Sequence, residues 1–191
     1  APNKAKELMK EAGYCSSKKM VLPLTFRSNV PADKLLAITW KEQIERDLPN
    51  CLELKLNGME STTVYRQLNK GTFSTVILDW RGAYPDPEAY LTPLLSCTEI
   101  INSKCKEGEA VTSGTFWGSA KLEKYLKESE RLNGLKRLRK LREVEEEAAY
   151  GTPFLPIWLV TPKAWVQPYL NEPKFDGSGH LILNQLQKIK E

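Results

Sequence analysis

The sequence has few of the side chains from which catalytic and metal sites are built. Its 191 residues include one histidine, His180, and its four cysteines form no C-x-x-C pair. A structural zinc site needs four Cys or His ligands at suitable spacing, and a nucleophilic serine or cysteine usually needs a histidine base. We therefore predict no metal, no cofactor and no catalytic triad, and we assign His180, beside a Gly-Ser-Gly turn, to a solvated loop.

Long apolar runs and glycine-rich loops are also missing. No stretch approaches the roughly 20 apolar residues that cross a bilayer, and no basic and apolar leader is recognisable at the N-terminus. The first residues, Ala1 to Tyr14, already follow a helical pattern, so we interpret the chain as a piece of a longer protein. No glycine-rich phosphate loop follows a predicted strand, and nucleotide binding therefore finds no support.

Charge of one sign does not dominate the chain. The net charge is +4, with 28 basic and 24 acidic residues interspersed, and the pI is about 8.8. A nucleic-acid-binding domain usually concentrates its positive charge in one stripe and has a pI above about 9. The basic run 136–142 is followed directly by the acidic run 143–147, which would repel phosphate. We interpret this helix face as solvated and laced with local ion pairs.

Apolar periodicity predicts alternating strands and helices. With 41% hydrophobic residues over this length, one sizeable domain is expected. Strand-like and helical patterns alternate in the first half, which predicts right-handed βαβαβ crossovers and a mostly parallel sheet flanked by helices, followed by a helical pair and a return strand: an α/β fold. The predicted helices cover residues 4–12, 32–48, 62–69, 87–95, 120–130 and 134–149, and the predicted strands cover 20–26, 51–56, 73–80 and 153–160, with a possible strand at 181–183.

Finer expectations follow from the same patterns. Gly13 should end the first helix, Ser61 or Thr62 should cap the third, and the polar stretch 96–118 should be a loop. Apolar spacing predicts buried stripes on two long helices. These stripes consist of Leu35, Leu36, Thr39, Trp40, Gln43, Ile44 and Leu48 on one helix, and Leu135, Leu138, Leu141, Val144 and Ala148 on the other.

The ends of the predicted strands indicate where a site would lie. Open α/β sheets bind ligands outside the carboxyl ends of their strands. Aromatic faces and forked guanidinium donors suit a binding surface for carboxylate or phosphate groups. Two alternatives stay open: Trp80 as a cap on the core, and Arg27 as the partner of a local acid on the surface. The predicted ligand contacts are Arg27, Asn29, Trp80, Arg81 and Tyr84.

Three segments, in order, resemble one family of transport proteins. The run Ala5–Tyr14 looks like the helix and turn that open the second lobe of peptide/nickel-type solute-binding proteins, family 5, of ABC transporters. The run Ile77–Leu91 resembles that family's most telling segment, a tryptophan shortly before Tyr-Pro-Asp-Pro and an aromatic-Leu pair. Downstream, Leu138–Pro156 is similar to the family's helix that ends in a short loop and an apolar strand containing proline.

The resemblance implies a periplasmic-binding-protein-like lobe and a transport function. Residues 1–167 would form the second lobe, and residues 168–191 a tail that belongs to, or leads back to, the first lobe. Two such lobes close on a small peptide-like or other polar solute, and the closed form docks on the membrane permease subunits. The resemblance further implies a periplasmic or extracytoplasmic location, a monomer, no bound nucleic acid and no enzymatic activity.

Two positions bear on the solute that the resemblance implies. Peptide-binding members of the family hold the ligand's ammonium group with an aspartate three residues after the tryptophan, and this chain has Ala83 there. Some dipeptide binders meet the ligand's carboxylate with an arginine four residues before a helix-opening proline. Arg27, four residues before Pro31, stands in that place.

Two other function classes are kept as alternatives. An α/β hydrolase or transferase domain would use Asp79 or Asp86 as a base, although no partner for either aspartate is visible in the sequence. A nucleic-acid-binding domain would rest on the basic run 136–142.

The four cysteines are predicted to form two disulfides. Cys97 and Cys105 lie close together in a polar stretch, and the location that the resemblance implies is oxidising. Cys15 and Cys51 lie just before the first strand and at the start of the second. If these strands are parallel neighbours, both cysteines reach the same end of the sheet, about 4.8 Å apart, provided that the residues after Cys15 fold back.

Overall fold

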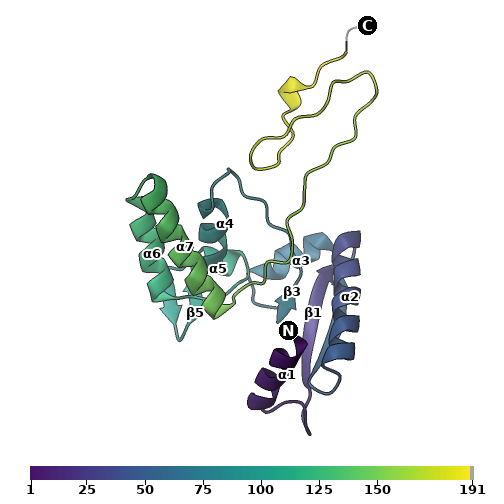
Figure 1. Cartoon of the computed structure of the whole chain (residues 1–191), viewed down its shortest axis with the longest axis vertical. Helices are drawn as coiled ribbons and strands as arrows, with labels where there is room; N and C mark the ends of the chain where they lie inside the picture. Colours follow the sequence, from purple (N-terminus) through teal and green to yellow (C-terminus); the bar gives the residue numbers. More distant parts are fainter. Residues whose placement is uncertain (190–191) are drawn as a thin grey trace. The chain divides into compact units, whose positions relative to one another are not determined.

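The computed structural model describes residues 1–189 and divides into two compact units (Figure 1). The first unit comprises Ala1–Asp79, and the second begins at Trp80. This division does not test the expected lobe boundary between residues 167 and 168, which stays a prediction. No helix within the described residues is long and apolar enough to cross a membrane.

The first unit is the predicted βαβαβ arrangement. Its three parallel strands lie in the order β2-β1-β3, so the first strand is central. Leu24 of β1 stands between Leu56 on one side and Thr75 on the other. The elements are α1 (Pro2–Glu11), β1 (Met20–Arg27), α2 (Pro31–Asp47), β2 (Leu52–Met59), α3 (Ser61–Leu68) and β3 (Thr75–Val76).

Helix α2 packs on the sheet with a face that differs from the predicted stripe. Ala37, Ile44 and Leu48 are buried, whereas Leu35 is 68% exposed and Thr39 and Gln43 are also exposed. The buried side of the first turn is taken by Asp33, which lies on the same helical face as Ala37 and pairs with a buried arginine of β1. This ion pair and the small Ala37 side chain fix the rotation of the helix, and the apolar spacing alone did not reveal it.

The third strand is shorter than predicted. The apolar run 73–80 suggested a long strand covered on both sides, but β3 spans only Thr75–Val76. Ile77 still donates a hydrogen bond to the carbonyl of Thr25, at 2.9 Å, and the chain then leaves the ladder. Within the described residues β3 has a single neighbour, β1, so fewer backbone groups hold it in the sheet.

Two helix ends in this unit are fixed by a glycine and by a capping side chain. Gly13 has a φ of +85° and lies two residues after α1, as predicted for a terminating glycine. The cap of α3 was predicted wrongly as Ser61 or Thr62. The cap is Glu60, whose carboxylate accepts a hydrogen bond from the backbone N–H of Thr63 at 3.3 Å and so serves an otherwise unpaired donor.

The predicted Cys15–Cys51 disulfide is present, with the two Cα atoms 3.9 Å apart. The chain folds back after Cys15, whose N–H donates to the carbonyl of Lys18 at 3.1 Å. Met20 then joins the sheet by donating to the carbonyl of Cys51 at 2.9 Å. The bridge therefore joins neighbouring parallel strands at the end where both begin, as the strand order predicted.

The second unit is built around a helical pair. Helices α6 (Ala120–Glu130) and α7 (Gly134–Gly151) match the predicted pair closely and share a core with α4 (Glu88–Leu95). The core residues include Leu95, Leu122 and Val144, each fully buried.

The predicted buried stripe of α7 holds only from its third turn onward. Leu141, Val144 and Ala148 are buried, but Leu135 and Leu138 are 73% and 48% exposed. In the first two turns Arg137 takes the inner side, because its guanidinium pairs with acids that precede and open α4. The leucines are therefore turned outward.

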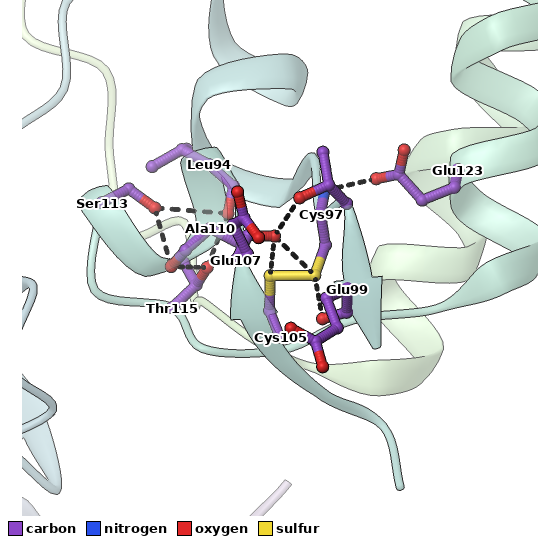
Figure 2. Close-up of a disulfide and its surroundings, with 10 residues drawn as sticks. Leu94, Cys97, Glu99, Cys105, Glu107, Ala110, Ser113, Thr115 and Glu123 are labelled. Carbon is purple, nitrogen blue, oxygen red and sulfur yellow. Dashed lines mark hydrogen bonds between the residues drawn. A yellow bond between two sulfur atoms is a disulfide. The ribbon is translucent and has the colours of Figure 1, made fainter. Parts of the chain in front are cut away.

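Residues 96–118 form an ordered subdomain where a loop was predicted. Strands β4 (Glu99–Ile101) and β5 (Lys104–Glu107) make an antiparallel hairpin, followed by the short helix α5 (Glu109–Thr112). The predicted Cys97–Cys105 disulfide is present and joins a residue just before β4 to the second residue of β5 (Figure 2). Gly108, at a φ of +133°, passes so close that a Cβ there would lie 2.8 Å from the Cα of Cys97. Strands of three and four residues are too short for apolar periodicity to reveal.

The return strand predicted at 153–160 is absent from the described part of the chain. Phe154 packs on the core of the second unit, but Leu159 and Val160 are 96% and 76% exposed. The run is apolar enough for a strand, yet no described segment pairs with it. The possible strand at 181–183 reduces to a single bridge between Phe175 and Leu181, followed by a 3-10 turn at Leu183–Gln185.

Candidate functional site

The carboxyl edge of the sheet in the first unit holds a network of polar side chains centred on Arg27. Arg27 is the last residue of β1, and its side chain is 8% exposed. Asp33, in the first turn of α2, binds the guanidinium with both oxygens, at 2.7 Å from Nε and 3.1 Å from Nη2. Such a bidentate pair is among the strongest and most directional side-chain contacts in proteins. It fixes the start of α2 against the end of β1.

Two further side chains complete this network. The Nη1 group of Arg27 donates to the hydroxyl of Tyr65, on α3, at 2.8 Å, and makes a close ion pair with Oδ1 of Asp79. The Tyr65 hydroxyl also donates to Asp79 Oδ1 at 3.3 Å. The network thus ties together β1, α2, α3 and the segment that follows β3.

Each ionisable group of the network responds to its neighbours. The hydrogen bonds from Arg27 to Asp33 raise the pKa of the guanidinium further above its ordinary value, against the effect of burial. Burial opposes the charge of Asp79, but the positive charge of Arg27 and its hydrogen bond outweigh burial and lower the pKa of that carboxyl. Burial raises the pKa of Tyr65, and the charge of Asp79 adds to the rise. At neutral pH Arg27 is therefore a cation, Asp79 a carboxylate and Tyr65 a neutral phenol.

Arg27 pairs with acids, as the alternative to a solute contact supposed, but its pair with Asp33 is buried rather than on the surface. Four of its five N–H groups are used by Asp33, Tyr65 and Asp79. One N–H of Nη2 has no acceptor within residues 1–189. A contact between Arg27 and a solute stays a prediction. Such a contact would use this one remaining N–H as its hydrogen-bond donor.

Asn29 lies two residues beyond β1 and also ties the edge together. Its side-chain carbonyl accepts hydrogen bonds from the N–H of Ser61 at 3.0 Å and from the Ser61 hydroxyl at 2.6 Å. Asn29 is exposed, and its amide NH₂ group makes no hydrogen bond within the described residues. The structure therefore brings Arg27 and Asn29 together around the start and the middle of α3.

The other predicted contacts, Trp80, Arg81 and Tyr84, share one loop at the beginning of the second unit. The Trp80 indole N–H donates to the carbonyl of Ala89 at 3.1 Å, yet the residue is 44% exposed. If Trp80 were a cap on a core, its ring would be enclosed, and an exposure of 44% does not match that alternative. Tyr84 is 47% exposed and Arg81 is exposed. The loop therefore presents two large aromatic side chains and a guanidinium at the surface of its unit.

The backbone of this loop is held by close packing and by Asp86. A Cβ at Gly82 would lie 2.7 Å from the Tyr90 ring, so the loop passes closely over α4 only because a glycine stands there. Asp86 accepts a hydrogen bond from the N–H of Glu88 at 2.9 Å. Arg137 donates to both of its oxygens, at 2.7 and 3.0 Å. These hydrogen bonds from Arg137 lower the pKa of Asp86 below its usual range.

The two aspartates considered as enzyme bases are both poor bases. A general base works best with a pKa near the operating pH. Arginine side chains hold the pKa of Asp79 and of Asp86 below the ordinary value for a free aspartate. This geometry favours a binding or structural role for both carboxylates.

A second polar cluster surrounds the disulfide of the hairpin and has a structural character. Figure 2 shows Glu123, on α6, accepting a hydrogen bond from the backbone N–H of Cys97, at 2.6 Å. Thr115 donates to the carbonyl of Leu94 at 2.6 Å on the other side of the subdomain. Burial raises the pKa of Glu123. The bond from Cys97 fastens the disulfide to α6, and the bond from Thr115 fastens the residues after α5 to α4.

Sequence reasoning did not predict the three partners of Arg27, which are Asp33, Tyr65 and Asp79. Asp79 is 52 positions from Arg27 and Tyr65 is 38, so no local pattern links them. Asp33 carried one usable signal. An acid in the first turn of a helix, six residues after an arginine at a strand end, is placed to pair with it.

A parallel βαβαβ sheet with polar side chains at its carboxyl edge is an open α/β sheet, the class of fold in which ligands bind at that edge. The sequence profile described as Bacterial extracellular solute-binding proteins, family 5 Middle matches residues 1–102, just over half of the chain. The chain belongs to this family of bacterial extracellular solute-binding proteins, as its segments suggested.

Individual relatives agree with this assignment. The periplasmic murein peptide-binding protein MppA of Escherichia coli (strain K12) is 30% identical over 95 residues, which cover 48% of this chain and 17% of that protein. The solved structure of the E. coli murein tripeptide binding protein MppA matches 80% of this chain and 27% of its own, with a TM-score of 0.65 and 23% identity. Haemophilus influenzae OppA in complex with RPPGFSPFR matches 99% of this chain and 35% of its own, with a TM-score of 0.75 and 17% identity.

The solved structures confirm the predicted fold class, an α/β lobe of the periplasmic-binding-protein type. The chain spans 17% of the length of the E. coli relative and about a third of the OppA structure, at 35%.

Proposed function

We propose that this chain is the second lobe of the solute-binding component of an ABC-type uptake transporter. The whole protein would capture a small peptide-like or other small polar solute between two lobes and deliver it to the membrane permease subunits. The family match over residues 1–102 carries this proposal. Two relatives support a peptide-like solute: MppA is named for binding murein peptide, and OppA is described in complex with RPPGFSPFR.

The location and the lack of catalysis belong to the same proposal. The E. coli relative is named as periplasmic, and an extracytoplasmic location agrees with two disulfides, which persist in oxidising compartments. Asp79 and Asp86 are held by arginines and have lowered pKa values, which supports binding rather than enzymatic chemistry. The protein is proposed to work as a monomer that binds no nucleic acid.

The solute contacts are proposed from four exposed side chains and the buried Arg27. Trp80, Arg81 and Tyr84 offer flat apolar faces and forked donors, which suit a peptide backbone and its charged groups. Asn29 offers its amide NH₂ group and Arg27 one N–H of Nη2, neither of which has an acceptor within residues 1–189. Residues 1–167 are proposed as the lobe, with residues 168–191 leading to the other lobe.

Native mass spectrometry of the full-length protein, purified gently without denaturation, tests this function. The expected result is a bound species of higher mass that releases a small polar or peptide-like solute on collisional activation. A protein that carries no solute and that no peptide or small polar solute shifts on titration would contradict the proposal.

A further inference from the structure

The network around Arg27 holds more negative charge than its own stability requires. Asp33 binds the guanidinium with two hydrogen bonds and is as buried as Arg27, the two side chains being 9% and 8% exposed. This pair is neutral by itself, and a buried pair of this geometry is already satisfied. Asp79 adds a second carboxylate, so the cluster carries a net charge of −1.

The surplus carboxylate is both exposed and held in place. The side chain of Asp79 is 72% exposed, and its Oδ1 receives Nη1 of Arg27 and the hydroxyl of Tyr65. Within residues 1–189 its Oδ2 has no hydrogen-bond partner. Exposed acids usually keep their rotamer freedom, because ordering a side chain costs entropy that a surface pair scarcely returns. Here a buried arginine and a tyrosine fix one oxygen and leave the other free.

The position of Asp79 matches that of a ligand contact. It follows β3 by a few residues and pairs with the last residue of β1, so it lies at the carboxyl edge of the parallel sheet. Open sheets of this kind bind ligands at that edge. Tyr65 beside it is 49% exposed, and an aromatic face next to a carboxylate is a favourable environment for an organic cation.

We propose that Asp79 is a specificity-determining residue whose free Oδ2 binds a positively charged group of the solute, a primary ammonium or a guanidinium, with Tyr65 flanking it. A net charge of −1 at the cluster is complementary to one such cation, and the contact is a charge-assisted hydrogen bond. Arg27 acts behind it as a positioning residue. The lowered pKa of Asp79 supports the assignment, because it keeps the carboxylate ionised at neutral pH. This inference rests on the proposed function.

Affinity selection by the full-length protein tests the assignment. The probe is an equimolar mixture of di- to pentapeptides without Lys, Arg or His, offered together with the same peptides acetylated at the N-terminus. A third set carries the acetyl group and one internal Lys or Arg. Mass spectrometry of the retained peptides reports which set is enriched. The first and third sets, each compared with the second, distinguish a terminal ammonium from a side-chain cation as the bound group.

The wild-type protein should enrich one of the two cationic sets about ten- to hundredfold over the acetylated neutral set, the effect of one hydrogen bond to a charged group. Asp79→Asn should abolish this preference. Tyr65→Phe should reduce it less, because the ring remains. Asp47→Asn, at the far end of α2 and paired with Arg46, is the matched control and should leave the preference unchanged.

The outcomes separate the two proposals. Retention of peptides with equal enrichment of all three sets, or an Asp79→Asn protein that keeps the wild-type preference, overturns the role of Asp79 and leaves the transport function standing. Retention of no peptide at all contradicts the peptide-like solute itself and overturns both. Should Asp79→Asn fail to fold, an undiminished preference in Tyr65→Phe would count against the site.

Discussion

Arg27 in the first unit and Arg137 in the second each bind two acids, and the two networks differ in how deeply these side chains are buried. The Arg27 side chain is 8% exposed, whereas that of Arg137 is 19% exposed. The acids of Arg137, Asp86 and Glu88, are comparably shielded, at 29% and 32% side-chain exposure. Those of Arg27 differ sharply: Asp33 is 9% exposed and Asp79 is 72% exposed.

From this comparison we infer that the burial of the arginine sets how much each network stabilises the fold. Unequal exposure of its two acids decides whether one carboxylate remains accessible to a ligand. In the Arg137 network both carboxylates have structural contacts. Asp86 also accepts a hydrogen bond from the backbone N–H of Glu88, which holds the turn before α4. The Arg27 network needs only Asp33 to neutralise the buried guanidinium. The second acid is left to face solvent in a fixed orientation.

Arg27→Met should have the largest effect on stability. It leaves Asp33 buried without a cation, and breaking a buried pair in this way costs about 3–5 kcal/mol. Denaturant unfolding followed by tryptophan fluorescence and circular dichroism measures the change. Arg46→Met is the matched control, because Arg46 makes an exposed pair with Asp47 and should unfold as the wild type does. Equal stability of the two variants would refute a structural role for Arg27.

The disulfides should stabilise the two units unequally. The Cys15–Cys51 bridge closes a separation of 36 residues and the Cys97–Cys105 bridge one of 8. Chain entropy then gives about 3.8 and 2.6 kcal/mol. The double substitutions Cys15→Ser with Cys51→Ser, and Cys97→Ser with Cys105→Ser, should lower the unfolding free energy in that order. Free thiols found by alkylation of the unreduced wild type would remove the basis of this prediction.

Arg137→Met should cost less than the loss of Arg27, about 1–2 kcal/mol, because the acids that it leaves are partly hydrated. Its effect should depend on pH. The pKa of Asp86 is lowered in the folded state, so the pair contributes fully above the unfolded pKa of about 3.9 and loses its contribution as pH falls through the folded value. Thermal unfolding at pH 7 and at pH 3 should show the gap between variant and wild type closing in acid. A gap of constant size would mean that Arg137 stabilises by packing alone.

The smallest stability effect is expected at Trp80. Its side chain is partly exposed and its one hydrogen bond is to a loop carbonyl, so Trp80→Ala in the full-length protein should shift the melting temperature by only a few degrees. Solute affinity should nevertheless fall, since the aromatic face is the proposed contact. A large loss of stability with unchanged affinity would reverse the assignment.

Sequence patterns predicted the framework of the fold but misjudged it where distant charges intervene. Strands β1 and β2, the crossover helices and the helical pair α6–α7 followed from periodicity and from turn residues. The predicted buried stripe of α2 was wrong at Leu35, Thr39 and Gln43, and that of α7 was wrong in its first two turns. At the start of these helices Asp33 and Arg137, rather than leucines, occupy the inner side. A hydrophobic pattern cannot reveal a charge that is buried because its partner lies far along the chain.

The candidate site was predictable in its place and less so in its members. The rule for parallel sheets led to Arg27 and Asn29, which do lie together near α3. Tyr65 and Asp79 joined them through side-chain contacts that depend on the register of three strands and on the position of α3. The hairpin of residues 99–107 escaped notice for a related reason, since a disulfide and the bond from Cys97 to Glu123 hold strands too short to show a pattern.

Titration calorimetry on the full-length protein and on this 191-residue chain, with the same peptide ligand, tests the central claim most directly. A solute held between two lobes loses about half its contacts when one lobe is removed, and what remains scarcely offsets the cost of immobilising it. The account predicts clear binding by the full-length protein and feeble binding by the chain alone. Equal affinity of the two would contradict it.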